Sequence, residues 1–341
     1  MKTRLFSFCA CSVFFSLMVP AVLSAGGKSD ADVSKTVTVY AYDSFTADWG
    51  PAPELARLFA EKTGMTVEFV SCGDAAQVLS RAVMERKSPG ADVLVGIDNN
   101  LLPAARSAGV LTAYKPAGSD AVDSSLLLSG DWLLTPYDWG YFACIFDTAS
   151  SVRRPENLED LCSPEYQGRI ILMDPRTSTP GIGFLAWTMG AYGDRWTDYW
   201  SRLKDNVLTL APGWDTGYGL FTSGEAPLVI SYTTSPAYHL EYEQTERYQA
   251  LVFPEGHAMQ IEGLGLVKGA ANSEGGKAFI DFMLTDEAQA VLPLTQWMYP
   301  VSASVELPAS YRLAPRAEKT VAAPVDEVGK AVNQAVSILG R

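Results

Sequence analysis

Ten residues from Asp174 to Gly183, DPRTSTPGIG, combine three hydroxyl side chains with an arginine and two prolines. Thr179 suits a helix N-cap and Pro180 the first helical position, and the apolar spacing of the following residues predicts a helix. The first turn of a helix offers unpaired N–H groups and a partial positive charge, so this segment could hold an anion. The alternative is a capped helix that binds nothing, and the segment alone does not decide between the two.

Four more polar loops follow predicted strands: YDSF, CGDAA, IDNN and YTTSP. The strands alternate with amphipathic helices, which predicts a parallel sheet with helices on both faces. Ligands of open α/β sheets bind beyond the carboxyl ends of the strands, so we expect the site in these loops. The clearest predicted helices cover residues 51–64, 74–90 and 273–292.

The first 25 residues have the layout of a secretory signal, with Lys2 and Arg4 before an apolar run that ends in small residues. The net charge of the whole chain is −13, and removal of this segment takes away two positive charges and no negative one. A strongly acidic surface repels nucleic acid and anionic membranes and attracts cations, although it can also serve solubility alone.

Three cysteines follow the signal, Cys72, Cys144 and Cys162, without a CxxC pair or a Cys/His cluster. The spacing therefore argues against a zinc site. A disulfide between Cys144 and Cys162 stays open. His239 and His257 are too few and too scattered for a catalytic triad or a metal site.

Six blocks of residues occur in an order that resembles a known family: TVYAYDSFTADWGP, ADVLVGIDNNLL, YDWGYFA, DPRTSTPG, SYTTSPAY and WMYPV. They resemble the periplasmic solute-binding proteins of bacterial ABC importers, in the branch that binds thiamine, from about Val37 to Val301. The resemblance implies an α/β fold of the type II periplasmic-binding-protein class. Its two lobes are each a mixed sheet flanked by helices, with the ligand cleft between them.

We expect a signal peptide at 1–25 and a flexible leader at 26–35. Lobe 1 would comprise 36–135 plus about 255–300, and lobe 2 would comprise 136–254 plus about 301–341. The resemblance implies a monomeric receptor in the periplasm with no catalytic residue, metal or cofactor. It would bind thiamine, thiamine phosphate and thiamine pyrophosphate and deliver them to an inner-membrane ABC permease with its ATPase.

Carried over position by position, the family's ligand site implies contacts from Asp74, Ala75, Ser178, Thr179, Trp214, Tyr232, Thr233, Thr234, Ser235 and Pro236. Further aromatic walls would come from Tyr42, Tyr238 and Trp297. The stretch CGDAAQ departs from the family's form beside Asp74, which puts the role of Ala75 in doubt.

The chemistry of thiamine matches these residue types. Its cationic thiazolium suits aromatic faces, its aminopyrimidine suits a carboxylate such as Asp74, and a phosphate suits the hydroxyls of Ser178 and Thr179 at a helix start. Structural roles stay open beside these. Tyr42 could be an inward strand residue and Asp74 only an N-cap. Trp214, which we expect in a loop between glycines, could belong to the core, and Trp297 could merely close a helix onto its lobe.

Two other classes of function remain. A thiaminase-I-like enzyme would use Cys72 as its nucleophile, but the nearby negative charge would raise the pKa of that thiol. A protein of the same fold could instead bind ferric iron or a polyamine. Iron would favour adjacent tyrosines, whereas Tyr232 and Tyr238 are separated by TTSPA.

Overall fold

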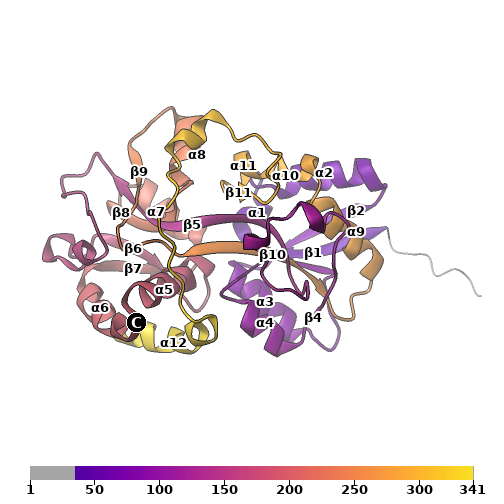
Figure 1. Ribbon diagram of the computed structural model, residues 1–341, viewed down its shortest axis with the longest axis horizontal. Coiled ribbons are helices and arrows are strands. Elements are labelled where there is room, and N and C mark those ends of the chain that lie inside the picture. The colour runs from indigo at the N-terminus through magenta and orange to yellow at the C-terminus, as the bar shows by residue number, and fades with distance from the viewer. Residues whose placement is uncertain (1–34, 341) are drawn as a thin grey trace, which may run out of the picture. The chain divides into compact units, whose positions relative to one another are not determined.

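A mixed sheet of eleven strands runs through the computed structural model, which describes residues 35–340 (Figure 1). Its main path follows the order β2 (Thr66–Ser71), β1 (Thr36–Ala41), β3 (Val93–Asp98), β10 (Met259–Val267), β5 (Thr135–Asp147), β8 (Leu228–Tyr232), β6 (Ile170–Met173) and β7 (Val207–Ala211). The short strands β4 (Leu111–Thr112), β9 (Tyr248–Leu251) and β11 (Tyr299–Pro300) pair with β10 or β5. The predicted signal peptide, and the predicted leader except Lys35, lie outside the described residues.

The long strand β5 joins two parts of this sheet. Its residues 135–141 pair antiparallel with β10, and its residues 142–147 pair antiparallel with β8 and β9. We call β1–β4, β10, β11 and residues 135–141 the first half-sheet, and β6–β9 with residues 142–147 the second half-sheet. Parallel pairing is confined to β1 with β2 and β3 and to β6 with β7 and β8 among the described strands, so the sheet is mixed. The lobe boundaries in the sequence stay a prediction.

Helices cover both faces of the first half-sheet (Figure 1). On one face lie α2 (Ala52–Thr63) and α9 (Ser273–Met283), whose Phe59 and Phe279 rings meet at a centroid distance of 5.6 Å. On the other lie α3 (Ala75–Met84) and α4 (Leu102–Ala108). α2 ends at Gly64, which adopts a left-handed φ of 71°, in agreement with the predicted helix 51–64.

The predicted helix 273–292 is wrong in extent. α9 ends at Met283, and two short helices follow, α10 (Asp286–Gln289) and α11 (Leu292–Thr295). The reason is local, because the Thr285 hydroxyl accepts a hydrogen bond from the Ala288 N–H and starts a new helix there. Pro293 then lies in the first turn of α11, where its missing N–H costs nothing.

The second half-sheet carries α5 (Thr179–Tyr192), α6 (Trp196–Leu203) and α7 (Trp214–Thr222). The C-terminal α12 (Val325–Ile338) packs against α5 and α6 (Figure 1). α5 is buried from Thr179 to Thr188. Gly183 lets it approach the sheet, since a Cβ there would lie 2.0 Å from the Phe142 ring.

Shorter elements complete the described chain. They are α1 (Asp43–Thr46), α8 (Ser235–Glu243) and 3-10 turns at Ser119–Ala121, Ser124–Leu126, Glu159–Cys162, Pro164–Tyr166, Gly193–Arg195, Lys204–Asn206 and Ala309–Leu313. In residues 35–340 no helix combines the length and the apolar character that crossing a membrane requires. Cys72, Cys144 and Cys162 are free thiols, so the disulfide considered from the sequence is absent.

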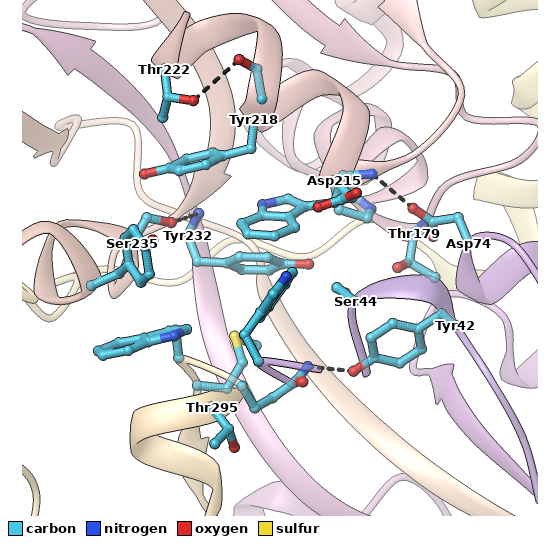
Figure 2. A pocket seen from close by; sticks show the side chains of 18 of the residues that line it. Tyr42, Ser44, Asp74, Thr179, Asp215, Tyr218, Thr222, Tyr232, Ser235 and Thr295 are labelled. Carbon is cyan, nitrogen blue, oxygen red and sulfur yellow. Dashed lines mark hydrogen bonds between the residues drawn. The ribbon is translucent and has the colours of Figure 1, made fainter. Parts of the chain in front are cut away.

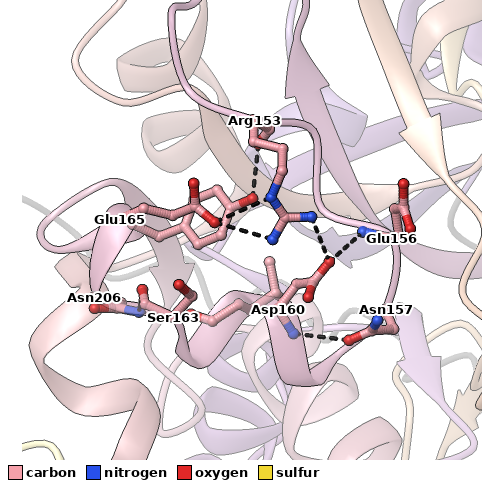
Figure 3. Close-up of polar contacts among 9 residues, drawn as sticks. Arg153, Glu156, Asn157, Asp160, Ser163, Glu165 and Asn206 are labelled. Carbon is pink, nitrogen blue, oxygen red and sulfur yellow. Dashed lines mark hydrogen bonds and ion pairs between the residues drawn. The ribbon is translucent and has the colours of Figure 1, made fainter.

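The loop that leads into β6 is held by side chains rather than by a sheet (Figure 3). Arg153 bridges Asp160 at 3.0 Å and Glu165 at 3.0 Å. Asn206 donates to the carbonyls of Leu161 and Ser163, at 2.7 Å each. These contacts anchor the segment before β6, whose far end carries the DPRTSTPG loop.

Candidate functional site

A pocket of about 720 Å³ lies between residues of the two half-sheets (Figure 2). Tyr42 and Asp74 reach it from the loops after β1 and β2, and Thr179 reaches it from the first turn of α5, which follows the loop after β6. These loops, which follow strands, therefore meet at one cavity, as a site beyond the strand ends requires, and the site itself stays a prediction. Its wall is largely aromatic, and the aromatic residues are Tyr42, Trp49, Trp214, Tyr218, Tyr232, Tyr238, Tyr242 and Trp297.

The charged groups on this wall are all acidic. Asp74, Asp215, Glu243 and Glu262 line the pocket, and no described lining residue is a lysine, arginine or histidine. A carboxylate-lined, aromatic cavity favours a flat ligand that carries positive charge.

Asp74 connects the two half-sheets at the pocket wall. Its Oδ1 accepts hydrogen bonds from the N–H groups of Ala75 at 2.6 Å and Thr179 at 3.2 Å, and its Oδ2 accepts one from Trp214 at 2.9 Å. These three residues begin α3, α5 and α7, so one carboxylate meets three helix N-termini. Burial raises the pKa of Asp74, and the three backbone donors oppose that rise.

Trp214 begins helix α7, so the prediction of a loop at this position is wrong. Gly213 serves as its N-cap, and the indole N–H donates to the Ser231 hydroxyl at 2.7 Å. The indole stacks on Tyr218, one helical turn later, with ring centroids 4.9 Å apart and an interplanar angle of 16°. The ring is thus held in place from one side while Trp214 lines the pocket.

Tyr42 is both an inward residue and a pocket residue. It follows the last residue of β1, is 7% exposed, and lines the pocket opposite Tyr218 and Tyr232 (Figure 2). Its hydroxyl donates to Glu262 Oε2 at 3.0 Å and accepts a hydrogen bond from the Gln296 side chain. Burial, reinforced by the charge of Glu262, raises the pKa of Tyr42 well above its ordinary value.

The pocket brings together many of the predicted site residues: Tyr42, Asp74, Thr179, Trp214, Tyr232, Ser235, Tyr238 and Trp297. The structure leaves the others off the pocket wall: Ala75, Ser178, Thr233, Thr234 and Pro236. All five of the latter are buried.

Helix starts explain part of this difference. Ser178, not Thr179, is the N-cap of α5, so Thr179 is its first helical residue and reaches the pocket instead. Thr234 is the N-cap of α8, and Pro236 lies in the first turn of that helix. Direct contact of these buried residues with a ligand stays a prediction.

Several lining residues escaped the sequence analysis, notably Tyr218, Glu262 and Gln296. A signal existed for Glu262, which is a lone acidic residue in the apolar strand MQIEGLGLV. Tyr218 follows Trp214 by four residues, so its place on the same helical face could have been recognised had α7 been predicted.

Cys72 does not line the pocket. Its thiol lies 3.5 Å from an Arg81 nitrogen, and burial is the main reason that its pKa is raised. A raised pKa lowers the thiolate fraction, which weakens the thiol as a nucleophile.

The chain is similar to known bacterial solute-binding proteins in sequence and in structure. The model of a family described as "Bacterial extracellular solute-binding protein" matches residues 88–320. The chain is 39% identical to the "Thiamine-binding periplasmic protein" of Brucella suis biovar 1 (strain 1330) over 320 residues, 92% of this chain and 94% of that protein. It is 41% identical to the protein of the same name from Escherichia coli (strain K12) over 278 residues, 81% and 83% of the two chains. A solved structure titled "Periplasmic thiamin binding protein" superposes with a TM-score of 0.82 at 37% identity and covers 89% of this chain and 95% of that one.

Proposed function

The chain belongs to the bacterial extracellular solute-binding protein family, and we propose that it is the periplasmic receptor of an ABC importer for thiamine. The observation that carries the proposal is the pocket wall, which combines stacked aromatic rings with carboxylates and, among its described residues, no basic side chain. A thiazolium gains from the faces of such rings, about 0.5–2 kcal/mol each. The relatives named for thiamine binding span nearly the whole chain, which supports the same ligand here.

We extend the proposal to thiamine phosphate and thiamine pyrophosphate as further ligands. Support comes from hydroxyl groups on the pocket wall, those of Thr179 at the start of α5 and Ser235 at the start of α8 among them. A helix start with a hydroxyl suits a phosphate oxygen. The receptor would act as a monomer and would deliver its ligand to an inner-membrane permease with its ATPase.

The proposal is a binding function rather than catalysis. The thiol that a thiaminase-I-like mechanism would need lies off the pocket wall, with a raised pKa. Incubation with thiamine and an amine nucleophile tests this directly, and cleavage of thiamine would overturn it.

Mass spectrometry of gently purified protein tests the ligand, because a tightly bound small molecule travels with its receptor. We expect thiamine or one of its phosphates, and a polyamine or iron in its place would refute the proposal. Titration calorimetry of Thr179→Val then tests the phosphate esters. We expect a loss of affinity for thiamine phosphate of about tenfold and a smaller loss for thiamine, as one hydrogen bond to a charged group disappears. Equal losses for both ligands would remove Thr179 from phosphate binding.

A further inference from the structure

Glu262 occupies an unusual position on the pocket wall. It lies in the middle of β10, lines the pocket, and is only 4% exposed. Its Oε2 accepts hydrogen bonds from the hydroxyls of Tyr42 at 3.0 Å and Tyr137 at 3.2 Å and from the Gln296 amide at 3.3 Å. Its Oε1 accepts one from the Gln260 amide at 3.2 Å. All these donors are neutral, so they stabilise the carboxylate without cancelling its charge.

A second buried carboxyl group lies directly beside Glu262. Asp138 on β5 is the direct cross-strand partner of Glu262 and is fully buried. Neither of its oxygens accepts a hydrogen bond from any described residue. Burial, with the neighbouring Glu262 charge, raises the pKa of Asp138 well above its ordinary value, so Asp138 stays neutral. Burial raises the pKa of Glu262 to about 7, so Glu262 is the carboxyl of this pair that ionises near neutral pH.

No ion pair of the described residues involves Glu262 or Asp138. A buried carboxylate without a cation is unfavourable, so it either takes up a proton or gains from a cation that binds beside it. The protein therefore holds an uncompensated charge at a cavity whose walls suit a cationic ring.

The other carboxylates of the pocket either have hydrogen-bond partners or are exposed to solvent. Both oxygens of Asp74 accept backbone N–H groups. Glu243 is 2.7 Å from the His239 ring nitrogen, and Asp215 is solvent-exposed. Glu262 alone among them combines near-complete burial with the absence of a charged or backbone partner.

We propose that the Glu262 carboxylate is the counter-charge for the positively charged ring of the ligand, which makes Glu262 the residue that selects a cation over a neutral molecule of the same shape. The inference rests on the proposed function, since that function supplies the thiazolium. The positive charge of the bound ring would balance the negative charge of the Glu262 carboxylate, which the neutral hydrogen-bond donors around it do not balance. Tyr42 and Gln296 orient the carboxylate toward the pocket and leave its charge unchanged.

Titration calorimetry at neutral pH tests the proposal with two ligands, thiamine and an analogue in which a neutral thiophene replaces the thiazolium. Glu262→Gln keeps the shape of the side chain and removes the charge. We expect this variant to lose about 10- to 100-fold in affinity for thiamine and less than about threefold for the analogue. Glu262→Asp keeps the charge and should retain part of the preference for thiamine.

The matched control is Glu68→Gln, which removes a carboxylate from an exposed position of β2, away from the pocket. We expect native affinity for both ligands. Equal losses for thiamine and the analogue in Glu262→Gln, or no loss for either, would overturn the inference. If the native protein binds neither ligand, the proposed function itself fails, which is a different result.

The pH dependence supplies an independent readout. The titratable groups that face Glu262 are its cross-strand partners Asp138 on β5 and Asp98 on β3 and the tyrosines Tyr42, Tyr137 and Tyr232. Because the pKa of Glu262 is raised, the carboxylate takes up a proton as the pH falls from neutral, and the native preference for thiamine over the analogue should shrink. Burial raises the pKa of Asp98 to about 7, so Asp98 titrates in the same range. The same pH series on Glu262→Gln separates the two groups. If the preference for thiamine over the analogue falls with pH as much in this variant as in the native protein, the effect belongs to Asp98, and the inference is contradicted.

Discussion

Replacing Asp74 with alanine removes the side chain that ties α5 and α7 of the second half-sheet to the loop after β2. Two of its three backbone hydrogen bonds cross between the half-sheets, those from Thr179 at 3.2 Å and Trp214 at 2.9 Å. Hydrogen bonds to a charged group contribute about 1.5–3 kcal/mol each. In the variant, water that enters the pocket can form hydrogen bonds with the freed N–H groups and recover part of this free energy. We therefore take about 1.5 kcal/mol for each lost bond and about 3 kcal/mol for the pair.

A loss of about 3 kcal/mol shifts the equilibrium between joined and parted half-sheets by roughly 100-fold. A ligand held between them must then supply the missing free energy, so the affinity for thiamine should fall by up to the same factor. Asp74→Asn should lose less, because one amide oxygen can still accept from Thr179 or from Trp214. Calorimetry measures the affinity, and solution scattering measures whether the radius of the free protein grows.

Asp123→Ala is the matched control, since that carboxylate accepts only from Ser125 in its own turn. It should leave affinity and radius unchanged. If Asp74→Ala behaves in the same way and loses only about 1 kcal/mol of unfolding free energy, Asp74 acts as the N-cap of α3 alone. Asp74 would then have no part in holding the two half-sheets together.

Three further changes test other parts of the structure. Trp214→Leu removes the ring that stacks on Tyr218 and should weaken thiamine binding about tenfold, and Trp214→Phe should give an intermediate affinity. If the neutral analogue loses affinity by the same factors in both variants, the ring acts through apolar area alone. Burial lowers the pKa of His257, so the unfolded chain binds more protons at this residue below about pH 6.5. The difference in unfolding free energy between the native protein and His257→Gln, measured in urea, should therefore grow in favour of the native protein as the pH rises through that range, and parallel pH profiles for the two proteins would contradict this. Gly183→Ala places a methyl group against the Phe142 ring and should lower the unfolding free energy by about 1–3 kcal/mol, and an unchanged melting temperature would show that α5 can shift at no cost.

Local sequence patterns determined the elements that depend on neighbouring residues. The sequence predicted a proline, Pro51 or Pro53, at the start of α2 and Gly64 at its end, and the structure has Pro51 as the N-cap, Pro53 in the first turn and Gly64 as the C-cap. Such signals act within one helical turn, so they can be read locally. The N-cap role of Asp74 is local in the same sense, since its capping box with Gln77 lies within four consecutive residues. The strand–helix alternation around β1, β2 and β3 was readable for the same reason, whereas the acidic charge of the chain agreed with a cationic ligand and with solubility alone.

Tertiary structure alone decided how distant segments meet at the pocket. Glu262 accepts from Tyr42, 220 residues away in the chain, and Asp74 receives the N–H of Trp214, 140 residues away. The antiparallel pairing of β5 with β10 places Glu262 opposite Asp138, and no periodicity within either strand specifies that register. The sequence by itself determined which residue types the chain contains. The hydrogen-bond network around Glu262 and the hydrogen bonds of Asp74 between the half-sheets form only when folding brings these groups together. The reason is that hydrogen bonding and burial depend on distance in space rather than on separation along the chain.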